Sequence, residues 1–251
     1  MNFLKFLVLC LVWGLTWIAV KAGVDAVPPL LFAATRFVAA GLILSLWAWP
    51  TARFGEWRRG DVVRLAAASL LMITLCYGPL FWGMLTVPSG TAAVLEMSLT
   101  PVALLGFGVA MGQERWSWIS ALAMGLGVVG LCVLFAPSLG AGATSAVGLA
   151  AVAWAALSYA WGSVLARPLV GRHGGALLSG ATMLIGGLAL LLVSLALEPA
   201  AGRALTTFWG WPAIAGWLFL VLFGSLVGYS LYMQLLRDIG PARAGSFAFV
   251  S

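Results

Sequence analysis

The sequence predicts an all-α integral membrane protein that crosses the bilayer many times. Of its 251 residues, 63% are hydrophobic and 8% are charged, whereas a soluble domain has about 25% charged residues. The apolar residues form runs of roughly 20, which is the length that a helix needs to cross the hydrocarbon layer. The basic residues that give the net charge of +6 lie mostly in the breaks between these runs. They therefore indicate orientation in a membrane rather than binding of nucleic acid.

The first five predicted spans form one unit. The first apolar run, 3–22, is too long for a signal peptide and lacks a small-residue cleavage site followed by a soluble domain. Residues 50–64 carry several charges and are expected to lie at the interface, with Trp57 at headgroup level. Short polar breaks separate the other runs, so we expect sequential helices to be antiparallel neighbours. The spans of this unit are 3–22, 29–49, 65–85, 89–110 and 116–135.

A second unit follows a stretch at 136–146 that is rich in Gly, Ala and Ser, carries no charge and suits a flexible linker. A short loop at 167–175 is expected between its first two spans. A ninth span begins near Pro241 and stops after about ten residues, too few to cross a bilayer. We therefore expect the chain to end inside an element of a longer native protein. The full spans of this unit are 147–166, 176–197 and 211–236.

The basic residues predict a cytoplasmic N-terminus. In that orientation ten of the thirteen basic residues lie on the inner side, and Lys21 and Arg203 lie outside while Arg36 lies within a span. This bias follows the positive-inside rule. The inner residues are Lys5, Arg53, Arg58, Arg59, Arg64, Arg115, Arg167, Arg172, Arg237 and Arg243.

The two units resemble each other weakly. When residues 78–100 are aligned without gaps on 229–251, Phe81 meets Tyr232 and Ser89-Gly90 meets Gly240-Pro241. A unit of five spans that occurs twice in one chain must lie in opposite membrane orientations, which is the inverted-repeat architecture of many transporters. The predicted domains are 1–135, a linker at 136–146, and 147–251. Ten helices are expected, of which this chain holds eight and the start of a ninth.

Several short motifs identify the chain as similar to the EamA domain of the drug/metabolite transporter superfamily. Their order and spacing carry the resemblance over the whole chain. In the first unit they are Trp13-Gly14-Leu15-Thr16-Trp17 with Lys21, Pro29 with Arg36-Phe37, the run Val87 to Ala93 with Thr100-Pro101, and Gly112-Gln113-Glu114. In the second unit they are Trp154, Tyr159 to Ser163 and Gly240 to Ala244.

The resemblance implies a ten-helix protein of two inverted halves around a central cavity. It further implies a multi-pass location in the bacterial inner (cytoplasmic) membrane and, for many members, export of amino acids and related metabolites. We expect alternating access around the cavity, with a small-molecule substrate, membrane lipid around the protein and a proton as a further candidate partner. We expect a monomer, without a cofactor, a metal site or a nucleic-acid partner.

Glu96 is the carboxylate that lies well inside an apolar span. A charge at this depth costs roughly 2.5–3.5 kcal/mol on insertion scales, so such a residue is expected to face a cavity or a partner. Recognition of a substrate amine and proton coupling are the functional hypotheses; a hydrogen-bonded structural carboxylate is the alternative.

Aromatic residues at helical spacing predict a cavity wall suited to apolar or zwitterionic metabolites, through ring contacts and cation–π attraction. Packing against lipid or other helices is the alternative for each ring. Gln234 is a further candidate for substrate contact or for bridging helices. The aromatic candidates are Trp17, Tyr77, Trp82, Trp161 and Tyr229.

Three residues are candidates for a gate or vestibule. Arg36 could cap an outer vestibule, or its guanidinium could snorkel toward the interface. Pro79 and Pro101 interrupt helical hydrogen bonds, so each produces a kink that could act as a pivot. Rigid packing around a fixed kink is the equal alternative.

Other functions fit the sequence less well. A membrane enzyme needs a nucleophile with its base, or metal ligands, at membrane depth, and the single histidine, His173, is expected in an inner loop. A channel needs repeated polar rings along a pore, and none is visible. A translocase for lipid or another hydrophobic metabolite, with the same fold, remains the alternative to an amino-acid carrier.

Overall fold

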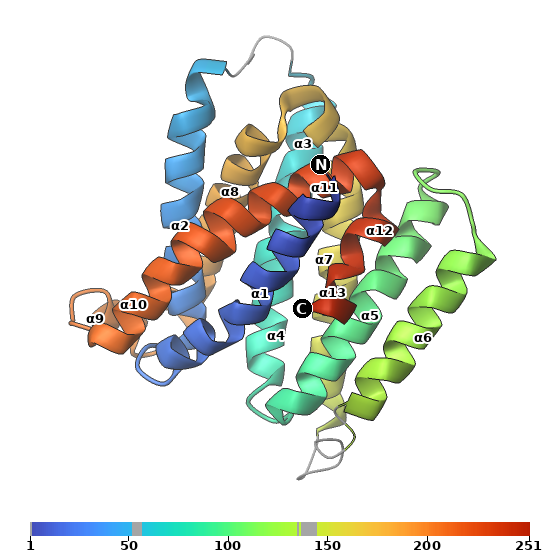
Figure 1. Ribbon diagram of the computed structural model, residues 1–251. Helices are drawn as coiled ribbons and strands as arrows, with labels where there is room; N and C mark the ends of the chain where they lie inside the picture. Colours follow the sequence, from blue (N-terminus) through green and yellow to red (C-terminus); the bar gives the residue numbers. More distant parts are fainter. Residues whose placement is uncertain (1, 52–56, 135, 137–144) are drawn as a thin grey trace.

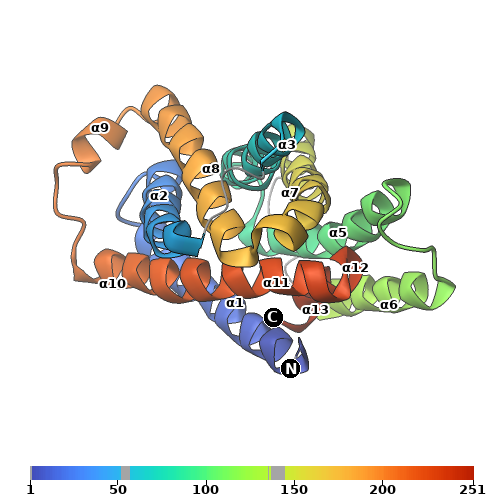
Figure 2. The same cartoon turned by 90° about the horizontal axis from the view of Figure 1, so that it is seen from above.

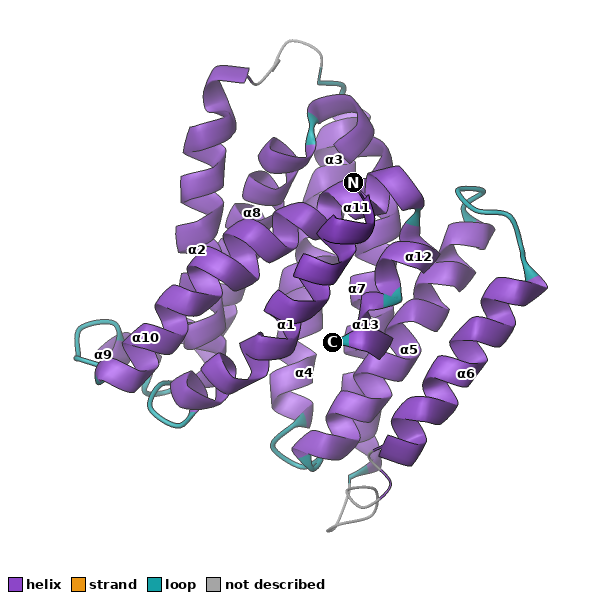
Figure 3. Ribbon diagram, viewed as in Figure 1, coloured by secondary structure: helices purple, strands orange, loops and turns teal. Residues whose placement is uncertain are grey.

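The computed structural model describes residues 2–51, 57–134, 136 and 145–251, and in this part of the chain it contains helices and loops but no strand. Figure 1 shows a bundle of long helices, with the connections gathered at its two ends. Figure 3 shows the same arrangement by secondary structure. Seven of the described helical segments are long and apolar enough to cross a membrane. The prediction of an all-α polytopic membrane protein is confirmed.

The described elements follow the predicted spans closely. Those of the first unit are α1 (Asn2–Val24), α2 (Pro29–Ala48), η1 (Trp49–Thr51), α3 (Arg59–Ser69), the π-helical η3 (Leu70–Thr74), α4 (Leu75–Gly83), α5 (Ser89–Ala110) and α6 (Trp118–Leu134). Those of the second are α7 (Ala146–His173), α8 (Gly175–Leu197), α9 (Ala201–Ala204), α10 (Trp211–Phe219), the π-helical η5 (Leu220–Tyr229), α11 (Ser230–Ile239), α12 (Pro241–Gly245) and α13 (Phe247–Val250).

The fifth predicted span is the shortest. Helix α6 has 17 residues, at the lower end of the length that can cross a bilayer. Figure 2 places it at the edge of the bundle, beside α5. The predicted linker at 136–146 lies mostly outside the described residues.

Two helix ends differ from the prediction by six residues or more. The third span begins at Arg59 rather than at residue 65, and the sixth continues to His173. Both helices extend beyond their apolar runs because Asp61 joins them: its Oδ1 accepts a hydrogen bond of 2.6 Å from Arg172, and its Oδ2 lies 3.4 Å from Nε2 of His173. The ring of Trp57 stacks on His173 at 4.0 Å. Trp57 therefore packs on α7, and the expected loop at 167–175 is reduced to Gly174.

Helices α2 and α8 pack against each other more extensively than any other pair. Glycines allow this contact, since a Cβ at Gly41 would lie 2.5 Å from the backbone N of Leu184 and one at Gly180 would lie 2.7 Å from the backbone N of Ser45. Small residues at such positions let two membrane helices approach backbone to backbone. This contact joins the second span of the first unit to the second span of the other.

The remaining helices pack around this pair. Helix α7 packs on α3, η3, α4 and α5, while α1 packs on α10, η5 and α11. Figures 1 and 2 show α1 lying along the long helix formed by α10, η5 and α11. Gly240, with φ of 87°, forms a one-residue joint between α11 and α12. The chain then turns back so that α12 lies on α5.

Candidate functional site

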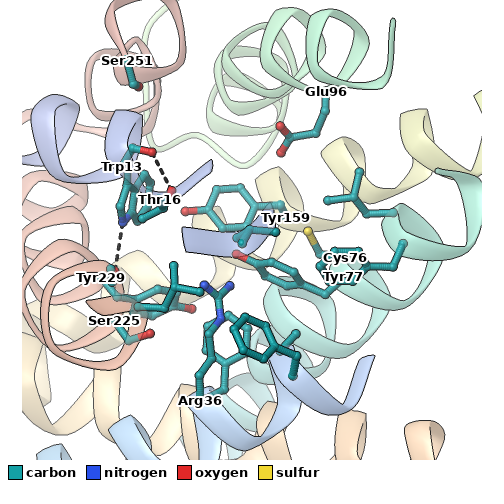
Figure 4. Close-up of a pocket in the computed structure, with 18 of the residues that line it drawn as sticks. Trp13, Thr16, Arg36, Cys76, Tyr77, Glu96, Tyr159, Ser225, Tyr229 and Ser251 are labelled. Carbon is teal, nitrogen blue, oxygen red and sulfur yellow. Dashed lines mark hydrogen bonds between the residues drawn. The ribbon is translucent and has the colours of Figure 1, made fainter. Parts of the chain in front are cut away.

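A cavity of about 150 Å³ is enclosed by side chains from α1, α2, α4, α5, α7, η5 and α13. Its walls are mostly apolar and aromatic, and the charged side chains among the described lining residues are Arg36 and Glu96. Figure 4 shows these two residues with the aromatic rings between them. The uncharged polar residues of the lining are Thr16, Cys76, Tyr77, Tyr159, Ser225, Tyr229 and Ser251.

Arg36 places a cation inside the bundle. Its side chain comes from α2 and the residue is 7% exposed. The guanidinium carbon lies 4.4 Å from the centroid of the Phe37 ring and 5.3 Å from that of Tyr77, and in Figure 4 the group points into the cavity. Its Nε has no hydrogen-bond partner in the described part of the protein. The expectation that the guanidinium snorkels outward is therefore wrong, because the two rings hold it inside; a role at a gate stays a prediction.

Glu96 places a carboxylate on a different wall of the same cavity. It comes from α5, and in Figure 4 its carboxylate points toward the space that the guanidinium of Arg36 enters from below. Within the described residues Glu96 forms no hydrogen bond, and no ion pair within 4.0 Å joins it to Arg36. The cavity thus holds two opposite charges that do not neutralise each other directly.

A cluster of aromatic rings backs the cavity. Trp13 on α1 contacts the ring of Phe247 at 4.5 Å and that of Tyr232 at 5.4 Å. Its Nε1 donates a hydrogen bond of 3.0 Å to the carbonyl of Gly224, which fixes the indole. Tyr159 on α7 lies 5.5 Å from Tyr232, and its hydroxyl is buried without a partner in the described structure. One polar group of this wall is therefore unsatisfied.

Sequence reasoning identified some lining residues and missed others. Glu96, Tyr77, Tyr229 and Arg36 meet at the cavity, but Tyr159 was missed. Tyr159 carries the signal of a hydroxyl at membrane depth, two residues before the predicted Trp161. Other lining residues that were not predicted as site residues include Trp13, Thr16, Ser225 and Phe247.

Three predicted contact residues lie elsewhere. Trp161 is 43% exposed and stacks on Phe107 at 6.0 Å. Trp82 is 53% exposed and lines a separate apolar groove, and Gln234 packs against Gly175. These residues project away from the cavity because their positions on the helix circumference face other neighbours. For Trp17 the structure describes the backbone in α1 but not the side chain.

The two predicted kink residues lie inside helices. Pro79 is in α4 and Pro101 is in α5. Pro79 lines the apolar groove together with Trp82, while the backbone of Pro101 lies close to Gly245 where α12 ends. Neither lines the cavity, and a role as pivots remains a prediction.

A carboxylate at one end of the bundle caps α2. Both oxygens of Glu198, which directly follows α8, accept hydrogen bonds of 2.9 Å from the backbone N–H groups of Leu30 and Leu31. Ser194 donates a further hydrogen bond of 2.6 Å to the same carboxylate. An anion at a helix N-terminus satisfies N–H groups that lack partners within the helix. Glu198 therefore fixes the start of α2 against the end of α8.

A second carboxylate plays a similar part at the opposite end. Glu114, between α5 and α6, accepts a hydrogen bond of 3.1 Å from the backbone N–H of Ala242 at the start of α12. Burial raises the pKa of Glu114 above its ordinary value, and the Ala242 N–H together with Arg167 and Arg243 opposes that rise. Glu114 thus holds α12 against the end of α5.

The described residues contain no group of three or more His, Cys, Asp or Glu side chains that could hold a metal ion. The side chains that line the cavity offer a guanidinium, a carboxyl group, hydroxyl groups and aromatic rings. Such a set orients a small ligand by a few polar contacts within an apolar enclosure.

Comparison with known proteins identifies relatives along nearly the whole chain. The chain is 30% identical to YedA of Escherichia coli (strain K12), named an uncharacterized inner membrane transporter, over 97% of this chain and 76% of YedA. It is 30% identical to the protein PecM of Dickeya dadantii over 96% of this chain and 77% of PecM. It is 27% identical to the uncharacterized transporter YvbV of Bacillus subtilis over 98% of this chain and 78% of YvbV.

A solved crystal structure shares the fold. The two chains superpose with a TM-score of 0.79 at 17% sequence identity, covering 99% of this chain and 83% of the other. The sequence model of the EamA-like transporter family matches residues 2–136, more than half of the chain. On this match and on its similarity to inner membrane transporters along nearly its whole length, the chain belongs to the EamA-like transporter family.

Proposed function

We propose that this membrane transporter is a secondary carrier that exports amino acids or related small metabolites by alternating access. The observation that carries the proposal is the cavity between Arg36 and Glu96, which holds opposite charges on different walls. Ionised groups in a low-dielectric interior are costly unless they are paired. A bound ligand that carries matching charges would offset this cost, so the cavity suits a small charged or zwitterionic solute.

Internal symmetry supports alternating access. The alignment that brings residue 78 onto 229 also carries η3, at 70–74, onto 221–225 within η5, at 220–229. The same shift carries Ser89, at the start of α5, onto Gly240, directly before α12. We take residues 1–135 and 147–251 as inverted halves that rock about the cavity.

The packing between the proposed halves agrees with this view. The first helix of each half packs on the third span of the other: α1 on α10, η5 and α11, and α7 on α3, η3 and α4. Helices α2 and α8, which are equivalent in the two halves, pack on each other. A two-fold relation between the halves accounts for both patterns.

We propose a cytoplasmic N-terminus in the inner membrane. Lys5 and Asp238 form an ion pair of 3.5 Å, and Arg172 pairs with Asp61 at the same end of the bundle. This end carries most of the basic residues, as expected for the cytoplasmic side. The direction of transport, export, follows from the resemblance to EamA exporters.

Transport into proteoliposomes tests the proposal. Purified protein would be reconstituted and supplied with a panel of radiolabelled amino acids, with and without a pH gradient. Glu96→Gln removes the charge of the cavity carboxylate with little change of shape. Asp25→Asn makes the same change at an exposed position and serves as the matched control.

Saturable uptake that responds to the pH gradient in the unmodified protein and in Asp25→Asn, but not in Glu96→Gln, would support a proton-linked amino-acid carrier. Saturable uptake that no gradient alters would support facilitated diffusion through the same cavity. If no amino acid is taken up, the substrate assignment is wrong, and lipids and other hydrophobic metabolites become the substrates to test.

A further inference from the structure

We infer that Arg36 binds the carboxylate of the transported amino acid and Glu96 its ammonium group, so that the cavity selects zwitterions over amines and amides. This inference rests on the proposed function and specifies which charged group of the substrate binds to each of the two side chains. It assigns to Arg36 direct contact with substrate.

The contacts of Arg36 leave part of its hydrogen-bonding edge available. The rings of Phe37 and Tyr77 lie 4.4 Å and 5.3 Å from the guanidinium carbon, so they cover the group by cation–π contact. The five N–H donors of a guanidinium lie in its plane and form a fork that matches a carboxylate. Because Nε has no partner in the described structure, part of this fork is unused in a residue that is 93% buried.

The position of Glu96 argues against a purely structural pair. Two opposite charges that only stabilise the fold are expected in direct contact, since separation leaves each desolvated without compensation. Glu96 and Arg36 instead form no ion pair within 4.0 Å and point into one space from two helices. A molecule that carries both a carboxylate and an ammonium group, such as an α-amino acid, neutralises both at once.

The net charge of the walls points to the same class of ligand. Among the described lining residues Arg36 and Glu96 are the charged ones, so their formal charges cancel. A zwitterion leaves the occupied cavity neutral, whereas an amine leaves it with an excess positive charge in a low-dielectric site. The volume of about 150 Å³ matches cavities that hold a benzene-sized molecule, which favours amino acids with small to medium apolar side chains.

Each amino acid is compared with its amide, so that the role of the substrate carboxylate can be tested separately from that of the ammonium group. Uptake would be measured for alanine, leucine and phenylalanine and for the amide of each, which keeps the ammonium group and lacks the carboxylate. A pH of about 7 keeps most of the amino groups protonated. The variants are Arg36→Gln, Arg36→Lys and Glu96→Gln, and Arg203→Gln at an exposed position is the matched control. Thermal unfolding and gel filtration of each variant in detergent show whether it folds.

The two cavity variants are expected to differ: Arg36→Gln changes the preference for acid over amide, whereas Glu96→Gln changes only the overall uptake. The unmodified protein and Arg203→Gln should prefer the acid over its amide by about tenfold or more, the range of one charge-assisted hydrogen bond. Arg36→Gln should lower uptake of the acid selectively and abolish this preference, while Arg36→Lys should retain part of it. Glu96→Gln should lower uptake of acid and amide together and leave their ratio unchanged.

Two outcomes overturn the inference alone: acid and amide are carried equally by the unmodified protein, or the preference survives in a folded Arg36→Gln variant. If Arg36→Gln does not fold, an unchanged preference in Arg36→Lys overturns it, since a single ammonium cannot replace the fork. If the unmodified protein carries none of the three amino acids, the proposed function fails and the inference fails with it.

Discussion

Helix α2 has two sides that follow different rules. Toward α8, Gly41 on α2 and Gly180 on α8 bring the two backbones into contact with no room for a Cβ. Toward the cavity α2 presents Arg36 and Phe37, and polar atoms there lack partners. The side toward α8 is tightly packed, and the side toward the cavity carries a charged group next to unfilled space.

The side of α2 that faces α8 holds the helix rigidly, whereas the side that faces the cavity carries the polar groups available to a ligand. A backbone contact through glycines tolerates little displacement, because interfaces of this kind have no flexible side chains to rearrange. The open side retains charges that cost free energy in the empty cavity. Helix α2 therefore carries Arg36, which we propose to bind the substrate, on a support that is packed tightly against α8.

The largest effect is expected from breaking the packed side. In Gly180→Val the new side chain would meet the backbone N of Ser45, since even a Cβ lies 2.7 Å away. We expect a loss of about 3 kcal/mol or more, the upper range for overpacking, seen as a lower thermal midpoint in detergent and low yield. Gly106→Val is the control, because a Cβ there meets nothing within 4 Å. Equal loss in both variants would contradict the assignment of a packed interface.

A smaller loss of stability is expected when the cap at the N-terminus of α2 is removed. Glu198→Ala leaves the N–H groups of Leu30 and Leu31 without their acceptors. Loss of a capping side chain costs about 0.5–2 kcal/mol, and the two hydrogen bonds place this variant near the upper value. Thermal unfolding measures it, with the exposed Asp25→Ala as control. A midpoint no lower than that of the control would show that the cap contributes nothing.

The other capping carboxylate, Glu114, is expected to make the stability of the protein depend on pH. Because burial raises the pKa of Glu114, the folded protein holds this proton more tightly than the unfolded chain does. That contribution to stability is complete below the ordinary value of 4.5 and is lost as pH rises through the raised pKa. Glu114→Gln keeps an oxygen for the Ala242 N–H and should flatten the stability profile over this range. Identical profiles for variant and parent would exclude the effect.

The smallest effect is expected outside the cavity. Trp161 is 43% exposed and stacks on Phe107, so Trp161→Ala should change transport by no more than about twofold, the range of surface substitutions. Tyr159→Ala, two residues away on the same helix, removes a lining ring and should reduce transport clearly more. If Trp161→Ala reduced transport more than Tyr159→Ala, the cavity would not be the site that the substrate occupies.

The fold was predictable because membrane spans are encoded by the length of apolar runs. The predicted start of the second span at Pro29 and the end of the seventh at Leu197 agree with α2 and α8. The start of α3 was missed because its first turn is charged, and Asp61 is satisfied there by Arg172, a residue more than one hundred positions away. No local pattern reports such a long-range partner.

Residues of the site were predictable from the sequence only where their side chains are unusual for a membrane-spanning helix. Glu96 and Arg36 were found because ionised groups are rare at membrane depth. Trp82 and Trp161 were chosen as lining residues, but the structure places them elsewhere. Membrane helices are apolar on every side, so the sequence pattern does not report which side faces the interior. That information lies in the packing of helices, as the two sides of α2 illustrate.

The π-helical segment η3 sets the phase of the third span. A π turn holds one residue more than an α turn, and each residue advances an α-helix by about 100°. The side chains after Leu70–Thr74 are therefore rotated by about that angle from where an uninterrupted helix would place them. Tyr77 follows η3 and reaches the cavity in this rotated frame. Deleting one residue of η3 would rotate Tyr77 away from Arg36 without replacing any lining residue, so the geometry of the cavity depends on the number of residues in η3 as well as on their identity.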